Sequence, residues 1–129
     1  MIRYVIGVVI VLHGLVHLWF VVLARGLVEY KPEMGWSGRS WLFTGLIGDP
    51  ATRILASILL LLVTVALSAG GIGFLIDQQW ARPVLIVSAL ASAIVLILFW
   101  DGSPQLIVQK GLIGLLIDAA IVAGLLIWP

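Results

Sequence analysis

The stretch IRYVIGVVIVLHGLVHLWFVVLA, residues 2–24, decides the fold class of this chain. It exceeds the roughly 20 apolar residues that a transmembrane helix needs, and Arg3 is its only charged residue. Backbone groups must be hydrogen-bonded within the chain inside a bilayer, which favours a helix. The stretch therefore predicts a transmembrane helix that carries the only two histidines of the chain, His13 and His17, in its middle. It is too long for the apolar region of a signal peptide, so we expect it to be retained.

The composition extends this prediction to the whole chain. Of the 129 residues, 63% are hydrophobic and 10% are charged, against about 45–50% and about 25% in soluble domains. The net charge of +1 comes without a clustered basic surface, so we expect no nucleic-acid partner. The chain has no cysteine, which excludes disulfides, thiolate metal sites, iron–sulfur clusters and thiol redox chemistry.

Three further apolar segments follow the first. Their starts carry helix-start signals in Asp49-Pro50, in Pro83 after Trp80, and in Ser103-Pro104. Short connections make neighbouring helices antiparallel. We therefore predict an all-α integral membrane protein, with one transmembrane domain over 1–129 that forms an antiparallel bundle of four transmembrane helices. The predicted spans are 2–24, 51–76, 83–100 and 104–128.

The first loop, residues 25–50, is longer than the other two and is rich in tryptophan. Tryptophan and tyrosine favour the membrane interface. Its second half, SWLFTGLIG (residues 40–48), is too short to cross a bilayer. It predicts an interfacial or re-entrant helix capped by Ser40, and an irregular loop on the headgroups is the alternative.

The distribution of basic residues predicts the orientation. The side with the first and third loops carries more lysine and arginine (Arg25, Lys31, Arg39, Arg53 and Lys110) than the side with the termini (Arg3 and Arg82). The positive-inside rule then places the long loop in the cytoplasm and both termini outside, in a prokaryotic cytoplasmic membrane. We expect Arg53 and Lys110 to extend towards the cytoplasmic interface; a site for an anionic lipid or substrate headgroup is the alternative.

A polar residue lies at nearly the same depth on each predicted helix. Counted from the face that holds the termini, His13, Thr64, Ser92 and Asp118 lie roughly 14–18 Å deep at 1.5 Å per residue. His17 lies one turn further on, so we expect it to line the way from this layer towards the long loop. Gly14, beside the histidines, would let another helix approach closely.

Asp118 is the most informative single residue. An aspartate at the centre of a transmembrane helix costs roughly 2.5–3.5 kcal/mol on insertion scales, so it needs a partner or a proton. His13 lies at the matching depth and is the predicted partner. Such a pair would hold or relay a proton, or bind the carbonyl of a quinone-like ligand; a structural pair that fixes helix register is the alternative.

Metal and haem are weaker alternatives. Two histidines four residues apart can bind one metal ion from a single helix, and Asp118 would be a third ligand. The sequence HGLVH lacks the glutamate of a zinc-protease motif. Ligation of one haem by two histidines needs imidazoles from opposite sides, and hence a dimer. We therefore predict no cofactor in the chain itself, with a quinone as the expected ligand.

Three short motifs resemble the small DoxX-like family of membrane proteins. They are Gly14-Leu-Val-His17, Leu46-Ile-Gly-Asp-Pro-Ala-Thr-Arg53 and Gly111-Leu-Ile-Gly-Leu-Leu-Ile-Asp118. His17 stands where many members of the family have lysine. The resemblance implies four transmembrane helices with a long first loop, and a role as a subunit of a quinone-linked oxidoreductase such as the thiosulfate–quinone enzymes. It supplies no catalytic motif.

Three functional hypotheses follow. In the first, the chain is a membrane subunit of a quinone-linked redox system, in which His13, His17 and Asp118 line an intramembrane pocket and a protein partner supplies the electrons. In the second, it is a structural or assembly subunit. In the third, it is a small-molecule enzyme or transporter, although one intramembrane acid is few for such chemistry. The sequence does not determine whether the chain forms a homo-oligomer.

Overall fold

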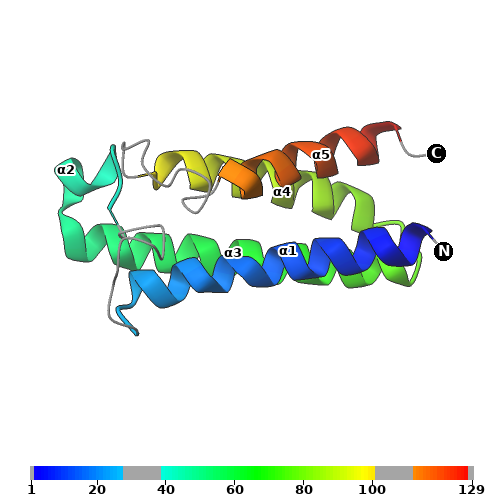
Figure 1. The fold of residues 1–129 in the computed structure, drawn as a ribbon, viewed down its shortest axis with the longest axis horizontal. Coiled ribbons are helices and arrows are strands. Elements are labelled where there is room, and N and C mark those ends of the chain that lie inside the picture. The colour runs from blue at the N-terminus through cyan, green and yellow to red at the C-terminus, as the bar shows by residue number, and fades with distance from the viewer. Residues whose placement is uncertain (1, 28–38, 101–111, 128–129) are drawn as a thin grey trace.

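The computed structural model describes residues 2–27, 39–100 and 112–127. These ranges contain helices and no strand (Figure 1). The helices are α1 (Ile2–Ala24), α2 (Phe43–Ile47), α3 (Asp49–Leu75), α4 (Ala81–Leu98) and α5 (Ile113–Ile127). The all-helical prediction is therefore confirmed for the described part of the chain.

Within these ranges, three helices are long and apolar enough to cross a membrane: α1, α3 and α4. Each also exposes large apolar side chains, for example Val16, Leu62 and Val87. Apolar residues on the outside of a helix bundle match the hydrocarbon of a bilayer, whereas a soluble bundle would place charged residues there. The described helices are thus those of an integral membrane protein.

The last helix differs from its prediction. The sequence predicts a span over residues 104–128, but α5 covers Ile113–Ile127, 15 residues, which is short of a full crossing. The predicted start of this span, together with Lys110, lies outside the described residues. The described ranges therefore establish three full-length apolar helices, and a fourth crossing stays a prediction.

Two helix starts also shift. The first and last residues of α1 are as predicted, whereas α3 begins at Asp49 and not at 51. Gly48, with φ +83°, takes the N-cap position, so Asp49 belongs to the first turn and does not cap the helix. A carboxylate there is stabilised by the helix dipole. Similarly, α4 begins at Ala81, two residues before Pro83, because a proline in the first turn removes no helical hydrogen bond.

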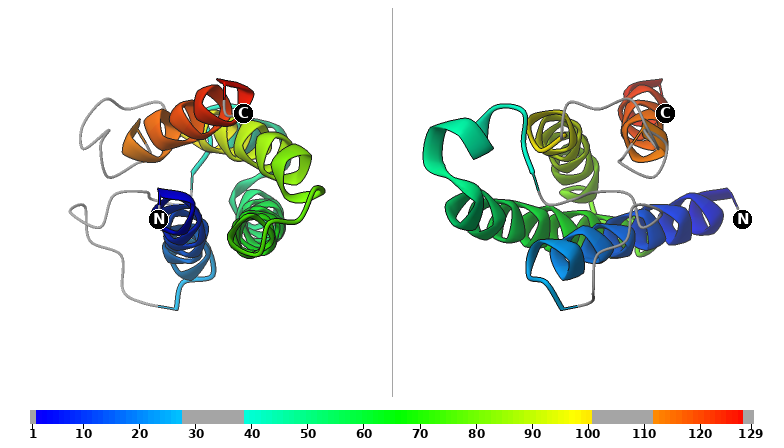
Figure 2. Two further views of the ribbon diagram at one scale, coloured as in Figure 1. Left: turned by 90° about the vertical axis from the view of Figure 1, so that its right-hand side faces the viewer. Right: turned by 60° about the vertical axis from the view of Figure 1, so that its left-hand side comes forward.

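The helices pack in chain order. α1 packs along α3, α3 along α4 and α4 along α5, whereas α1 and α5 scarcely touch one another. Figure 2 shows this order, with α3 and α4 on one side and the ends of α1 and α5 on the other. The start of α1 and the end of α5 lie at the same end of the molecule (Figure 1). The side of the membrane to which this end belongs stays a prediction.

Glycines set the close approach of α1 and α3. A Cβ on Gly14 would lie 3.0 Å from Cβ of Leu67 and 3.3 Å from the backbone nitrogen of Ser68. One on Gly7 would lie 2.5 Å from the Leu75 side chain. Small residues let membrane helices pack backbone to backbone. The predicted role of Gly14 is therefore confirmed, and the partner helix is α3.

The end of the long loop is tied to the end of α4. The Ser40 hydroxyl donates to the carbonyl of Leu98 and accepts from the backbone N–H of Phe43 at 3.1 Å. The Phe43 ring stacks on Phe99, with 5.2 Å between centroids. The predicted short helix is therefore present as α2, which has no buried residue, but Leu42 and not Ser40 takes its N-cap position. Its depth relative to a membrane stays a prediction.

Candidate functional site

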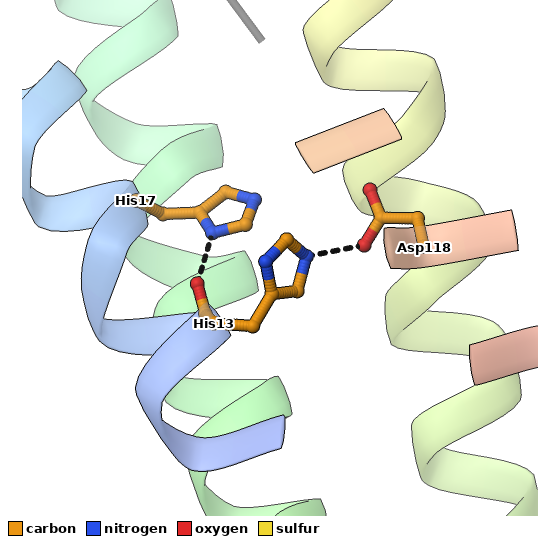
Figure 3. Close-up of side chains that lie close together, drawn as sticks. All are labelled: His13, His17 and Asp118. Carbon is orange, nitrogen blue, oxygen red and sulfur yellow. Dashed lines mark hydrogen bonds and ion pairs between the residues drawn. The ribbon is translucent and has the colours of Figure 1, made fainter. Parts of the chain in front are cut away.

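Four polar side chains from three helices meet in the interior of the bundle. His13 and His17 come from α1, Ser92 from α4 and Asp118 from α5, and all four are buried, with exposed fractions of 5%, 2%, 0% and 1%. We call these residues the His–Ser–Asp cluster. The histidines are four residues apart and therefore project from the same side of α1. Figure 3 shows both rings turned towards Asp118.

Hydrogen bonds join the cluster into one chain. Nε2 of His13 lies 2.7 Å from Oδ1 of Asp118. Oδ2 of Asp118 lies 2.6 Å from the Ser92 hydroxyl, which lies 2.7 Å from Nε2 of His17. Nδ1 of His17 donates to the His13 carbonyl at 2.9 Å. The contact between His13 and Asp118, predicted from their matching depth, is therefore confirmed (Figure 3).

The place of His17 corrects its prediction. The sequence separates His17 from the midplane layer by one turn, yet its ring reaches Ser92 at that layer. The Nδ1–H of His17 bonds the His13 carbonyl, and this orients the ring so that Nε2 reaches the Ser92 hydroxyl. The two rings lie edge to face, with centroids 5.0 Å apart. His17 thus belongs to the same cluster as His13.

The hydrogen-bond pattern restricts the positions of the protons. A carbonyl only accepts, so Nδ1 of His17 carries a hydrogen. The Ser92 hydroxyl has a single proton for its two neighbours, His17 and Asp118. If it donates to the Asp118 carboxylate, then Nε2 of His17 must donate to Ser92, and His17 is an imidazolium. If it donates to a neutral His17, then Oδ2 of Asp118 must carry a hydrogen and donate to Ser92.

These two arrangements have the same net charge and satisfy the same contacts. They differ by the shift of two protons along the path from Oδ2 through Oγ to Nε2, with no movement of heavy atoms. In both, Nε2–H of His13 donates to Oδ1 of Asp118, so Nδ1 of a neutral His13 is an acceptor. The described residues offer no hydrogen-bond partner to this nitrogen. The cluster can therefore hold the same proton at Asp118 or at His17, and it has one unused acceptor.

A cavity of about 470 Å³ adjoins the cluster. His13 and His17 line it together with Trp19 and with Gly114 and Ile117 of α5. A Cβ on Gly114 would lie 3.7 Å from Cε1 of His13, which is ordinary van der Waals contact, so Gly114 borders the imidazole. Apart from the two histidines, the walls are almost entirely apolar, which is the usual construction of a small-molecule site.

Of the other predicted site residues, Thr64 is buried but stays outside the cluster. Its hydroxyl donates to the Leu60 carbonyl of its own helix at 2.9 Å. Arg53 bonds Asp49 at 3.2 Å and donates to the carbonyl of Leu23 at 3.2 Å, so it holds the last turn of α1. The sequence did not indicate this contact, because no local pattern links residues thirty positions apart.

The ligand atoms of the cluster are spaced too widely for a single zinc ion. His13, His17 and Asp118 each offer one ligand atom, and these atoms spread over up to 4.8 Å. Ligands at about 2.0–2.2 Å from one zinc ion can be no more than about 4.4 Å apart. The ligand atoms would have to move together and give up the Ser92 hydrogen bonds. A metal site therefore stays the weaker alternative.

Comparison of the chain with protein-family models, curated proteins and solved structures finds no match. The cluster and its cavity are therefore the features that indicate a function, and the DoxX-like resemblance stays a prediction.

Proposed function

We propose that this chain binds a quinone-type molecule inside the membrane and serves as an integral subunit of a redox system. The observation that carries the proposal is the unused acceptor on His13, a 5% exposed residue, beside a largely apolar cavity. A lipid-soluble ring with an oxygen substituent would fill such a cavity and meet His13. Buried ionisable residues in membrane helices commonly mark ligand or proton pathways.

The proton positions favour the reduced form of this ligand. Because Nδ1 of His13 is an acceptor when Nε2–H bonds Asp118, it pairs with the O–H of a quinol rather than with the carbonyl of a quinone. A proton passed from the quinol to Nδ1 would make His13 an imidazolium beside the Asp118 carboxylate. The cluster would then exchange that proton while a partner exchanges the electrons.

The sequence contains no motif for an electron-carrying cofactor, so we assign electron transfer to a membrane or soluble oxidoreductase partner. A DoxX-like identity would agree with this role, because that family includes subunits of quinone-linked enzymes. The cytoplasmic position of the long loop would place the segment around α2 on the side where a soluble partner could dock.

We expect duroquinol to bind the purified protein, and His13→Gln to weaken that binding about tenfold. The glutamine amide donates to Asp118 from near the position of Nε2, but its carbonyl oxygen does not occupy the position of Nδ1, so one hydrogen bond worth about 1.5 kcal/mol is lost. Trp19 lines the same cavity, so binding can be measured as quenching of its fluorescence. The difference in quenching between the wild type and Trp19→Phe gives the signal that comes from this cavity.

Thr64→Ala is the matched control for this test. Thr64 is buried like His13, but its hydroxyl bonds only within its own helix, so the affinity for duroquinol should stay at the wild-type value. If neither duroquinol nor duroquinone binds the wild type, the proposed function is wrong. If the wild type and His13→Gln bind duroquinol with equal affinity, His13 does not bind the ligand.

A further inference from the structure

A second cavity, of about 360 Å³, lies between α1 and α5. Its lining consists of apolar side chains and glycine, including Val5, Val9, Ile117, Ile121 and Gly124. It holds no titratable group, so by itself it offers nothing to a polar ligand. Its position beside the first cavity is what connects it to the candidate site.

The two cavities are neighbours, because Val9 and Ile117 line both of them. Together they follow α1 from the level of His13 back to Val5, and we call this apolar path the groove. Eight residues of helix correspond to about 12 Å. The groove exists because α1 and α5 scarcely touch along this side of the bundle.

The groove also faces the lipid. Val5 and Val9 in its wall have exposed fractions of 57% and 49%. In a bilayer, such a groove is filled with hydrocarbon. A hydrocarbon chain attached to a ring at His13 would lie in it without leaving an apolar surrounding, and the whole molecule could enter sideways from the membrane.

We propose that the groove between α1 and α5 holds the prenyl tail of the ligand, so that the site selects long-chain quinols. This inference rests on the proposed function, because the ring at His13 fixes where the tail begins. The order of groups matches such a molecule: a polar end at His13, then an apolar path along Val9 towards Gly124. The contribution of the tail comes from apolar contact within the groove.

Gly124 gives a direct way to test the groove. It lines the cavity, and a Cβ built on it meets nothing within 4 Å. The Cβ of a leucine at this position therefore meets no neighbouring atom, so we expect the side chain to occupy part of the groove, and leucine is also the better helix former. Gly45 in α2 is the matched control, because its Cβ also meets nothing within 4 Å and it lines neither cavity.

The experiment compares two probes, duroquinol and a ubiquinol analogue with a two-isoprene tail, by quenching of Trp19 in detergent. We expect wild type and Gly45→Leu to bind the tailed probe at least about tenfold more tightly. In Gly124→Leu this preference should fall to about twofold or less, with the affinity for duroquinol unchanged. Partition of the tailed probe into micelles is the same for all three proteins, so it cancels in the comparison.

Three outcomes would overturn the inference, and they separate it from the proposed function. If duroquinol binds but the tail adds no affinity, the groove is not a tail site and the proposed function stands. If the tail adds affinity equally in Gly124→Leu and Gly45→Leu, the tail lies elsewhere. If neither probe binds the wild type, both the inference and the proposed function are wrong.

Discussion

Replacement of Ser92 by alanine is expected to lower the free energy of unfolding by about 2–6 kcal/mol. The Ser92 hydroxyl is the common partner of Oδ2 of Asp118 and Nε2 of His17, and its loss leaves both buried atoms unpaired. Each buried polar group without a partner costs about 1–3 kcal/mol. The measurement is denaturation of the detergent-solubilised protein followed by circular dichroism.

Ser88→Ala is the control for this prediction. Ser88 lies one turn earlier on α4 and is similarly buried, but its hydroxyl bonds the Val84 carbonyl of its own helix at 2.6 Å. That carbonyl keeps a helical partner when the hydroxyl is removed, so we expect a loss within about 0.5 kcal/mol. If Ser92→Ala and Ser88→Ala cost the same, the hydroxyl of Ser92 does not join the cluster.

The loss of stability on substitution of Asp118 is expected to depend on the hydrogen-bonding capacity of the new side chain and not on its charge. Asp118→Leu should cost about 3 kcal/mol, the lower end of the range for removal of one partner of a buried pair, because it leaves Nε2–H of His13 without an acceptor. Asp118→Asn should cost less than about 1 kcal/mol, the scale of one neutral hydrogen bond. Its oxygen accepts from His13 and its amide donates to Ser92, which can then donate to a neutral His17.

Asp118→Asn therefore fixes the cluster in one of its two proton arrangements. The same denaturation measurement gives the stabilities, and infrared difference spectroscopy reports the proton on the Asp118 carboxyl group. A carbonyl band of a protonated carboxylic acid that is present in the wild type and absent from Asp118→Asn would report the arrangement in which Asp118 carries the proton. If asparagine destabilises the protein as much as leucine does, the two arrangements are not equivalent in hydrogen bonding.

Depth counting along the chain predicted the contact between His13 and Asp118, although 105 positions separate these residues. It succeeded because a bilayer fixes the length of each helix, and hence the level of each residue along it. The same counting gave the start of α1 and its end at Ala24, because Arg25 and Gly26 interrupt the apolar run.

Depth counting does not determine the rotation of each helix about its axis. Thr64 and Ser92 lie at similar predicted depths, but only Ser92 faces Asp118. The packing of α1 against α3 at Gly7 and Gly14 sets the rotation of these two helices about their axes. Sequence spacing alone does not show which glycine meets which helix. The contact of the His17 ring with Ser92 was missed because the count followed the backbone and did not include the reach of the side chain.

Contacts at the helix ends were also missed. Arg3 pairs with Asp77 at 3.0 Å and lies over the Phe74 ring. Asp77 occupies the tight turn between α3 and α4 with φ +61°. Both side chains are on the same predicted side of the membrane, but their pairing depends on the direction in which the turn projects. Turn geometry of this kind is fixed by tertiary packing and has no signature in Asp77-Gln78-Gln79-Trp80.

Native mass spectrometry of the protein purified from its membrane, with lipid extraction of the same sample, shows which molecule the site holds. We expect a bound prenylquinone or its quinol on the wild type, retained by Thr64→Ala and strongly depleted in His13→Gln. A metal ion or haem at His13 and His17 of the wild type, or equal retention of the quinone in His13→Gln, would show that the site is not a quinone site built on His13.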